Sequence, residues 1–307
     1  MKGIVIKSTG SWYSVLQANG EKTDCRIKGL FRIKGIKTTN PIAVGDEVEF
    51  VFEEGKNTGM ITAIEERKNY IIRKAINLSK QSHIIAANID QAFLIVTVIK
   101  PRTSAGFIDR FLATCEAYRI PVNIIFNKTD LLNEQLKNLQ KETISVYEKI
   151  EYRCFEISAI DKENVTQITN LCKGKINLIS GLSGTGKSTI INAFEPKLNL
   201  KTNAISTHEK GMHTTTFAEM FPLSKGGFII DTPGVQEFGM FDIKKEELSH
   251  YFREIFEASK DCKYNSCLHI DEPKCAVRAA LERNEIANSR YYSYMSILNS
   301  DEMGNKY

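Results

Sequence analysis

The sequence contains one eight-residue pattern whose spacing suits the binding of phosphate groups. Residues 181–188 read Gly-Leu-Ser-Gly-Thr-Gly-Lys-Ser and match the pattern G-x-x-x-x-G-K-[ST] at every position. An apolar run, Ile176–Ser180, precedes the loop, and a helical pattern over Lys187–Phe194 follows it. In such a loop glycines let backbone N–H groups turn toward the phosphates, and the start of the helix adds positive potential. The sequence therefore predicts a site for a nucleoside triphosphate.

Each side chain of this phosphate loop has an expected role. Lys187 reaches the β- and γ-phosphates, Ser188 places its hydroxyl on Mg²⁺, and Thr189 is close enough to contact the α-phosphate. The predicted contacts with the nucleotide are Gly181, Leu182, Ser183, Gly184, Thr185, Gly186, Lys187, Ser188 and Thr189.

A second motif indicates which base is bound. The residues Asn127-Lys128-Thr129-Asp130 directly follow the apolar run Val122–Phe126, at the end of a strand where open α/β sheets bind ligands. A carboxylate at Asp130 can accept hydrogen bonds from N1–H and the 2-amino group of guanine, and adenine offers no matching pair of donors. Taken alone, this short motif is also compatible with an ordinary polar turn.

Two neighbours of Asp130 complete the predicted guanine site. Asn127 can tie the base-binding loop to the phosphate loop, and the stem of Lys128 can cover the ring. The loop Ser158-Ala159 follows the apolar run Cys154–Ile157, and the backbone N–H of Ala159 can bind the guanine O6. Together these residues predict GTP as the ligand.

Two further segments have the residue types of γ-phosphate sensors. In Asp231-Thr232-Pro233-Gly234 the aspartate would hold Mg²⁺ through water, and the N–H of Gly234 would contact the γ-phosphate. His213-Thr214-Thr215-Thr216 lies in a stretch with little regular pattern, which is typical of a switch segment. Thr215 is the first choice to complete the Mg²⁺ shell, and the other two threonines stay open as alternatives.

Three of the seven cysteines crowd together near the C-terminus. Cys262, Cys267, His269 and Cys275 offer three thiols and one imidazole within fourteen residues. Four soft ligands suit tetrahedral Zn²⁺, and such a site would be structural because no position is left for water. Buried free cysteines are the alternative. The four remaining cysteines are expected to be reduced and buried.

The elements that must position these residues fall into three segments. Up to about Ile71 short strands alternate with turns, which predicts a small closed barrel such as an OB-fold. From about Leu78 to Met240 apolar runs alternate with helical patterns, which predicts a parallel sheet covered by helices on both faces. The rest is helical around the cysteine cluster. The predicted domains are residues 1–71, 78–240 and 241–307.

The order of the motifs is unusual. Ordinary Ras-like GTPases have the phosphate loop first and the guanine motif last, whereas here the guanine motif at 127 precedes the phosphate loop at 181. At this point the sequence resembles the RsgA family of circularly permuted bacterial GTPases. The resemblance covers nearly the whole chain: the strand-rich start with Val44-Gly45-Asp46, the permuted motifs and the cysteine cluster.

The resemblance implies an α/β fold and a function. The implied architecture is a circularly permuted P-loop GTPase domain between an N-terminal OB-fold barrel that binds RNA and a C-terminal helical zinc domain. It also implies binding to the 30S ribosomal subunit and its 16S rRNA, in late assembly, with GTP hydrolysis stimulated by the subunit. The permutation adds a hypothesis: residues 235–241 tether the C-terminal domain to the γ-phosphate sensor, so nucleotide state reorients that domain.

The residue that orients the attacking water is harder to predict. Ras-type enzymes use a glutamine directly after D-x-x-G, but this chain has Val235 there, and Gln236 comes one position late. His213 is the better candidate, because a switch loop can bring it over the γ-phosphate, and the resemblance favours a histidine beside the threonines. The alternative is a solvent-exposed loop histidine. Lys187 and His213 are therefore the predicted catalytic residues.

Composition narrows the remaining choices. Lys and Arg exceed Asp and Glu by 41 − 37 = 4, which is too little to argue for nucleic acid. The basic loop with Lys28, Arg32, Lys34 and Lys37 suits either solvent or a phosphate backbone. Near the C-terminus Arg278, Arg283 and Arg290 suit rRNA, whereas the tyrosines at 291, 292 and 294 suit either base stacking or a core.

The expected protein is a cytoplasmic monomer. No membrane span is expected, because the longest apolar run, Ala92–Ile99, is far too short. No signal peptide is expected either. Two rival functions are a GTP-dependent RNA-binding chaperone with negligible hydrolysis and a P-loop kinase. GTP turnover with and without 30S subunits separates all three.

Overall fold

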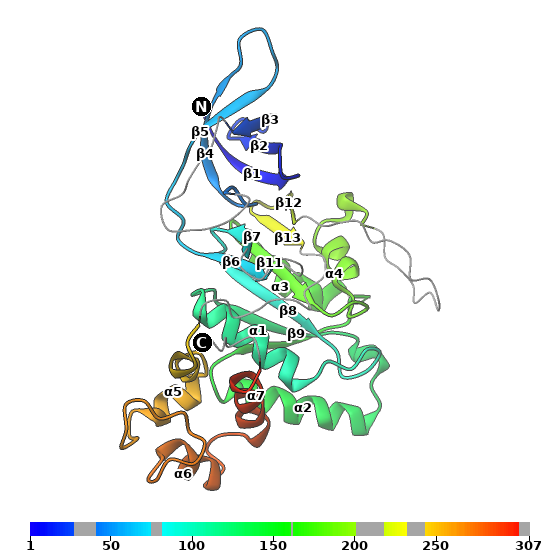
Figure 1. Ribbon diagram of the computed structural model, residues 1–307. Coiled ribbons are helices and arrows are strands. Elements are labelled where there is room, and N and C mark those ends of the chain that lie inside the picture. Colours follow the sequence, from blue (N-terminus) through cyan, green and yellow to red (C-terminus); the bar gives the residue numbers. More distant parts are fainter. Residues whose placement is uncertain (28–40, 75–81, 161, 201–217, 232–242, 301–307) are drawn as a thin grey trace.

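The computed structural model describes residues 1–27, 41–74, 82–160, 162–200, 218–231 and 243–300 (Figure 1). The strands are β1 (Lys2–Ser8), β2 (Tyr13–Gln17), β3 (Lys22–Ile27), β4 (Glu47–Phe52), β5 (Gly59–Ile64), β6 (Tyr70–Lys74), β7 (Ser82–Ala87), β8 (Gln91–Val96), β9 (Val122–Phe126), β10 (Arg153–Glu156), β11 (Ile176–Gly181), β12 (Glu219–Pro222) and β13 (Phe228–Asp231). The helices are α1 (Ala105–Ala117), α2 (Glu134–Glu148), α3 (Lys162–Cys172), α4 (Lys187–Phe194), α5 (Arg253–Ser259), α6 (Ala276–Glu282) and α7 (Asn288–Leu298).

The first five strands form a small closed barrel. β1 pairs with β2 and also with β4, which closes the curved sheet on itself. Alternate residues of these strands point inward, as the period-2 pattern requires, and Val5, Tyr13, Val15, Phe50 and Ile61 are buried at its centre. The predicted N-terminal barrel is confirmed. The basic loop of residues 28–37 lies outside the described residues.

The middle of the chain forms a parallel sheet with helices on both faces, as predicted. Its strand order is β10-β9-β8-β11-β13-β12, and only β12 runs antiparallel to its neighbour. α1 and α2 cover one face, where Leu94 and Ile124 meet Leu112 and Ile144. α3 and α4 cover the other face in the same way. Strands buried on both faces explain the continuous apolar runs seen in the sequence.

The barrel and the parallel sheet are physically continuous. β12 pairs with β1 (Lys7 opposite Glu219), so a single sheet of eleven strands runs through both (Figure 1). Gly45 reinforces the junction: its φ is +92°, and a Cβ there would lie 2.2 Å from the carbonyl oxygen of Ala87. Only glycine permits this backbone contact without a local shift. The boundary proposed near residue 71 therefore separates two parts of one connected body.

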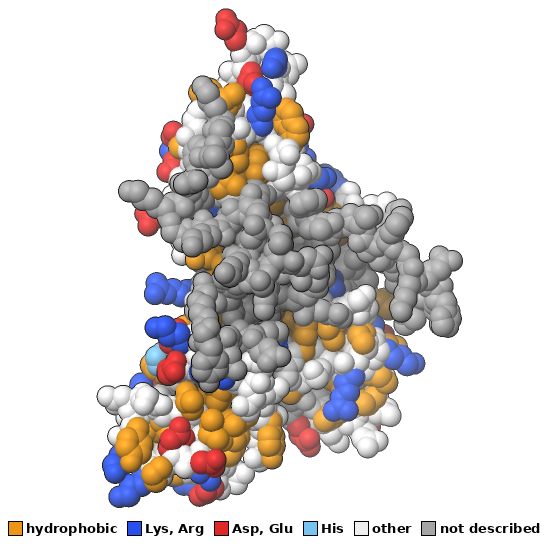
Figure 2. All heavy atoms as spheres, in the orientation of Figure 1, with side chains coloured by type: hydrophobic (Ala, Val, Ile, Leu, Met, Phe, Trp, Pro, Cys, Tyr) orange, Lys and Arg blue, Asp and Glu red, His pale blue; other side chains and the backbone are white. Residues whose placement is uncertain are grey.

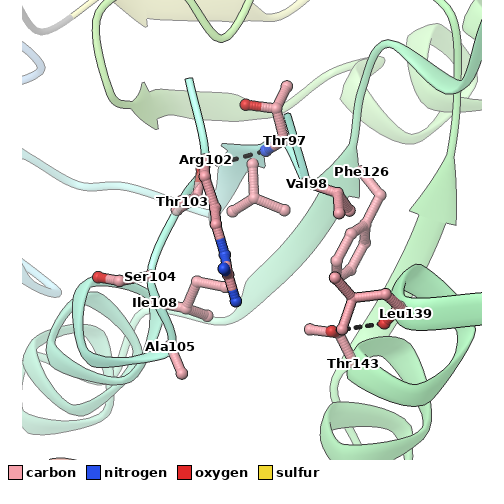
Figure 3. Close-up of a pocket in the computed structure, with 11 residues that line it drawn as sticks. Thr97, Val98, Arg102, Thr103, Ser104, Ala105, Ile108, Phe126, Leu139 and Thr143 are labelled. Atoms are coloured by element: carbon pink, nitrogen blue, oxygen red, sulfur yellow. Dashed lines mark hydrogen bonds between the residues drawn. The ribbon is translucent and has the colours of Figure 1, made fainter. Parts of the chain in front are cut away.

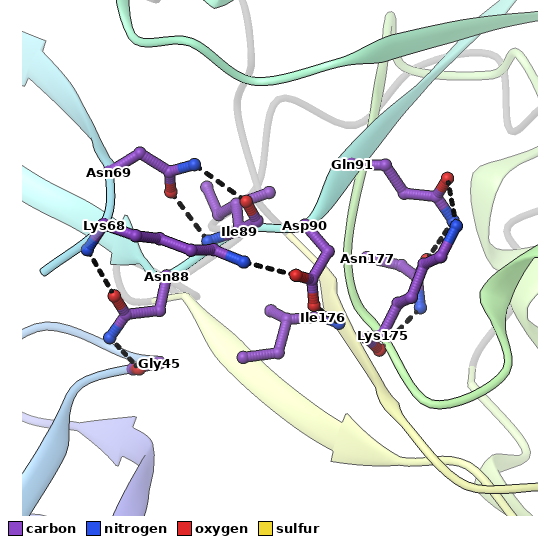
Figure 4. Close-up of polar contacts among 10 residues, drawn as sticks. All are labelled: Gly45, Lys68, Asn69, Asn88, Ile89, Asp90, Gln91, Lys175, Ile176 and Asn177. Carbon is purple, nitrogen blue, oxygen red and sulfur yellow. Dashed lines mark hydrogen bonds and ion pairs between the residues drawn. The ribbon is translucent and has the colours of Figure 1, made fainter.

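Polar contacts fasten the same junction at the amino ends of the parallel strands (Figure 4). Asn88 donates from Nδ2 to the carbonyl of Gly45 at 3.0 Å, and Lys68 forms an ion pair with Asp90. Asp90 accepts the backbone N–H of Ile176 at 2.7 Å, at the start of the strand that leads into the phosphate loop. Through Asp90, the segment that follows the barrel is thus linked to the strand that carries the phosphate site.

The C-terminal helices pack on α1. The 3₁₀ helix Lys245–Tyr251 and helices α5, α6 and α7 share a core that includes Ala113 of α1 (Figure 1). Arg290 of α7, only 1% exposed, donates to Asp109 of α1 at 2.7 Å and to Glu254 of α5 at 2.6 Å. The interpretation of Arg290 as an rRNA contact was therefore wrong, because its guanidinium is buried and bonded to Asp109 and Glu254.

Several elements differ from the sequence-based expectation. α1 begins at Ala105, because Ser104 caps it by accepting the N–H of Phe107. α2 begins in the same way after the cap Asn133, which accepts the N–H of Leu136. The ribbon of β6 and β7 and the helix α3 were not predicted. None of the helices in the described ranges is long and apolar enough to cross a bilayer.

Surface charge is as mixed as the composition suggested. On the face shown in Figure 2, acidic and basic side chains are interspersed over the barrel and over the C-terminal helices. Several of them pair, such as Arg26 with Glu53 and Arg283 with Glu285. Exposed pairs of this kind contribute little stability, typically below about 1 kcal/mol. Overall charge therefore does not indicate the partner.

Candidate nucleotide and metal sites

The phosphate loop lies between β11 and α4, in the context that its motif requires. Gly186 has a φ of +98°, and a Cβ there would lie 2.3 Å from the Asn127 amide nitrogen. Glycine at this position lets the guanine motif and the phosphate loop pack against each other. Thr185 is fully buried and closes the loop by donating from Oγ1 to the carbonyl of Leu182 at 2.9 Å. Ser188 and Thr189 stand half-buried in the first turn of α4.

Lys187 and Asp231 are two buried, oppositely charged groups at this loop, and each affects the pKa of the other. The Lys187 ammonium donates to the carbonyls of Gly181 and Leu182, each at 2.8 Å. Burial lowers the pKa of Lys187, and the nearby Asp231 opposes that shift. Burial also raises the pKa of Asp231, which ends β13 beside the loop. Such a buried ammonium can bind a phosphate, and such a buried carboxylate can bind a divalent cation, so this pair is typical of a functional site.

Asn127 ties the base-binding loop to the phosphate loop. Its Nδ2 donates to the carbonyl of Thr185 at 2.8 Å, while its Oδ1 accepts the N–H of Ala159 at 3.0 Å. The sequence suggested that the Ala159 N–H faces guanine O6, but in this structure that N–H is bonded to Asn127. One amide side chain thus joins three loops that are far apart in the sequence.

Lys128 makes a second connection. Its ammonium donates to the carbonyl of Gly184 in the phosphate loop at 2.6 Å and to that of Lys100 at 2.5 Å. Burial lowers the pKa of Lys128, and Asp130 opposes the shift. The contact with Lys100 was not foreseen, because nothing in the sequence relates the loop after β8 to the phosphate loop.

An open cavity of about 410 Å³ lies beside these loops, lined by Thr129, Asp130, Ser158 and Ile160. Within the described residues the Asp130 carboxylate has no hydrogen bond or ion pair, so its oxygens face the cavity's solvent. Ile160 is 81% exposed, a large apolar side chain at the rim. The cavity has the acceptor and the apolar wall that a guanine ring requires.

Three predicted site residues cannot be placed. His213, Thr215 and Gly234 lie outside the described residues, as do the alternatives Thr214, Thr216, Val235 and Gln236. The predicted nucleotide contacts that are described lie at the carboxyl ends of the neighbouring strands β9, β10, β11 and β13 (Figure 1).

The four predicted metal ligands converge near the C-terminus. The ligand atoms of Cys262, Cys267, His269 and Cys275 all lie within 4.8 Å of one another. The Cys262 and Cys275 sulfurs are 4.0 Å apart, and they lie 3.7 and 3.5 Å from His269 Nδ1. A tetrahedral zinc site would place its ligand atoms about 3.6–3.8 Å apart. The separations among Cys262, Cys275 and His269 are close to these values, so the cluster is suited to hold a metal ion.

The loop that carries the ligands is held by its own polar contacts. Glu272 accepts the N–H groups of Leu268 and Ile270, at 2.7 and 2.8 Å. Burial works to raise the pKa of Glu272, but these donors outweigh it and lower that pKa. Tyr291 donates to the carbonyl of His269 at 2.7 Å, and Tyr294 donates to that of Leu268 at 3.0 Å. Tyr291 and Tyr294 are therefore structural, whereas Tyr292 is 69% exposed.

Family models match nearly all of the first 241 residues. Residues 2–61 match the RsgA N-terminal domain, and residues 64–241 match the RsgA GTPase. The "Small ribosomal subunit biogenesis GTPase RsgA" of Phocaeicola vulgatus is 56% identical over 305 residues, covering 99% of this chain and 98% of that protein. The chain belongs to the RsgA family. The protein of the same name from Flavobacterium johnsoniae is 54% identical, with 98% and 94% covered.

Solved structures agree with this RsgA assignment. YjeQ from Thermotoga maritima superposes with a TM-score of 0.77 at 34% identity, covering 97% of this chain and 96% of that one. YloQ, described as a circularly permuted GTPase, superposes with a TM-score of 0.73 at 30% identity, covering 97% and 93%. This RsgA-family chain is therefore a GTPase with the circularly permuted fold that the motif order implied.

Proposed function

We propose that the chain binds GTP at the converging loops, hydrolyses it to GDP and phosphate, and uses this cycle in biogenesis of the small ribosomal subunit. Identity above one half over essentially the whole length to proteins named for this role carries the proposal. Such work would take place in the cytoplasm. The immediate partners would be the 30S subunit and its 16S rRNA, and the chain would bind them as a monomer.

The described residues have distinct tasks in the proposed reaction. Asp130 selects guanine, Asn127 and Lys128 hold the base loop against the phosphate loop, and Lys187 neutralises charge on the β- and γ-phosphates. Mg²⁺ bound with the nucleotide would supply further charge neutralisation. Ser188, Asp231 and Thr215 are the residues that would hold it, Asp231 through water. Thr129, Ser158, Ala159 and the remaining phosphate-loop residues complete the proposed nucleotide contacts.

His213 is proposed to orient the attacking water. A positioned general base contributes roughly a hundredfold to ten-thousandfold, so His213→Ala should lower the subunit-stimulated kcat at least about a hundredfold. GTP turnover is measured on the full-length chain with and without purified small subunits. His250→Ala, an exposed histidine in contact with Phe256, is the control and should retain the stimulated rate.

The same assay tests the proposed function itself. Wild-type turnover should be slow alone and rise with subunits. GTP binding without turnover, even when subunits are present, would favour the chaperone hypothesis instead. Unchanged stimulated kcat in His213→Ala would remove that histidine from the mechanism and leave the function intact.

We propose zinc as the ion held by Cys262, Cys267, His269 and Cys275, because three thiolates and one imidazole suit a closed tetrahedral site. Elemental analysis of the purified chain should find one zinc per chain, and Cys275→Ser should lose it. Because the bound metal stabilises the folded loop, the rate of amide hydrogen exchange over residues 260–276 should rise by at least about tenfold when the metal is lost. Cys154→Ser, which alters a cysteine of the parallel sheet, is the control. Full zinc content in Cys275→Ser would contradict this ligand set.

A further inference from the structure

A second cavity lies beside the guanine motif, on the face of the sheet that α1 and α2 cover. It has a volume of about 290 Å³ and opens between the loop after β8, the first turn of α1 and one side of α2 (Figure 3). Its floor is apolar, formed by Val96, Ile108 and Phe126, and Leu139 stands opposite. None of the residues that line it is acidic. The volume lies at the lower limit for small-ligand sites, which suits a single ring system or one large side chain.

The loop that forms one wall is tightly closed. The N–H of Thr103 donates to the carbonyl of Thr97 at 2.9 Å, the N–H of Thr97 donates to Thr103 Oγ1 at 3.1 Å, and Thr97 Oγ1 donates to the carbonyl of Pro101 at 2.5 Å. These bonds turn the side chain of Arg102 along the cavity (Figure 3). Hydroxyls of Thr97, Thr103, Ser104 and Thr143 add polar groups to the walls.

Two cations of this loop, Arg102 and Lys100, have no partner among the described residues. Among the residues that the structure describes, the Arg102 guanidinium makes no hydrogen bond or ion pair, and the same holds for the ammonium of Lys100. Both side chains are exposed. An apolar cavity with a free guanidinium at its mouth is complementary to a ligand that combines a ring with an anion.

The same loop touches the nucleotide site. Lys128 of the guanine motif donates to the carbonyl of Lys100, and a Cβ on Gly184 of the phosphate loop would lie 3.4 Å from the Pro101 ring. Phe126 on the cavity floor directly precedes Asn127. The loop and the strand that line the cavity are therefore adjacent to the residues that bind base and phosphate.

We propose that this cavity receives one unpaired nucleotide of ribosomal RNA, with its base inside the apolar cavity and its phosphate on Arg102. The proposal rests on the proposed function, because the RNA comes from the small subunit. Proteins recognise RNA mainly at unpaired bases, which stack on aromatic rings while cations contact the backbone. The alternative ligand is a protein segment with a carboxylate beside an apolar side chain, since it would also be complementary to the positive charge of Arg102. RNA is favoured because Lys100 and Arg102, the two cations without a partner among the described residues, can follow a phosphate backbone.

Docking of this nucleotide would couple the subunit to catalysis. It would stabilise the loop of residues 97–103 against Lys128 and Gly184, and so fix the base and phosphate loops in one arrangement. The expected consequence is that part of the subunit's stimulation of GTP hydrolysis depends on the cavity, whereas turnover by the free protein does not.

Two variants test the cavity by different means. Arg102→Ala removes the charge, and Thr143→Phe fills the space from α2 without touching the loop. Each should lower the subunit-stimulated kcat/KM roughly five- to hundredfold, the range seen for one stacked base. Intrinsic turnover and GTP affinity should stay at wild-type values. Lys137→Ala removes an exposed charge on α2 outside the cavity and is the matched control.

The ligand class is tested by ultraviolet crosslinking of the wild-type chain to purified small subunits, followed by mass spectrometry. A nucleotide crosslinked to the peptide that contains residues 97–110 or 137–146, and lost in Thr143→Phe, is the expected result. Crosslinks from these peptides only to a ribosomal protein would overturn the RNA assignment. Wild-type stimulation in both variants would overturn the coupling. If the wild-type chain itself shows no stimulation, the proposed function fails rather than the cavity.

Discussion

An Asp130→Asn chain should change its preference from GTP to xanthosine triphosphate. In the proposed complex the Asp130 carboxylate accepts two hydrogen bonds from guanine, and an amide cannot accept both. Hydrogen bonds to a charged group contribute about 1.5–3 kcal/mol each. The affinity for GTP should therefore fall about a hundredfold to ten-thousandfold. Xanthine carries a carbonyl in place of the 2-amino group, so it can accept a hydrogen bond from the new amide.

The Asp130 prediction is checked by equilibrium titration of fluorescent GTP and XTP analogues. Glu134→Gln makes the same change of charge four residues away, at a site where the carboxylate only pairs with exposed Lys137, and should bind GTP like the wild type. GTP preference retained by Asp130→Asn would show that the cavity beside Thr129 and Ser158 is not the guanine site. Loss of both ligands would show instead that the loop had collapsed, which circular dichroism would detect.

The local parts of the site could be predicted because their chemistry is contiguous in the sequence. The phosphate loop is one strand, one loop and one helix, and the structure has β11 and α4 at those positions. The same holds for the metal cluster, whose four ligands lie within fourteen residues. For such sites spacing alone carries geometric information, since the backbone between the residues is short.

The parts that failed depend on contacts between distant residues. Arg290 was interpreted as an rRNA contact because a basic residue can neutralise phosphate, yet it is buried against Asp109, which is far away in the sequence. The hydrogen bond from the N–H of Ala159 to the distant Asn127 was not predicted either. The contact of Lys128 with Lys100 and the pairing of β12 with β1 are of the same kind. A periodic pattern reports which face is buried but not what lies against it.

These distant contacts change how the C-terminal helices should respond to nucleotide. The motif order suggested that they are tethered only through residues 235–241, which lie outside the described residues. The structure adds a second connection, because α7 packs on α1 and α1 follows the loop bonded to Lys128. A reorientation of the C-terminal helices must therefore open the interface with α1, whereas a concerted movement would keep it closed.

Arg290→Met should loosen this interface more than any surface change in the C-terminal helices. Burial works to lower the pKa of Arg290, but Asp109 and Glu254 outweigh it and raise that pKa, so the guanidinium stays charged. Removing it leaves two buried carboxylates without their cation, which costs about 3–5 kcal/mol. Urea unfolding, followed by hydrogen exchange of the α7 peptide, measures the loss. Arg283→Met, at an exposed pair with Glu285, should leave the stability close to that of the wild type, because solvent screens such pairs.

The combined variant Asp109→Leu with Arg290→Met separates charge from packing. It removes the buried cation and one of its carboxylates together, and replacing buried ion pairs by apolar groups is often neutral. Stability should therefore recover toward the wild type in part, because Glu254 still lacks its cation. Hydrogen exchange of α7 in the wild type, with GDP and with a GTP analogue, then decides between the two movements. Equal protection in both states means that the C-terminal helices stay packed on α1. Lower protection in one state means that the Asp109–Arg290 contact opens there, and only then does the tether at 235–241 control the helices alone.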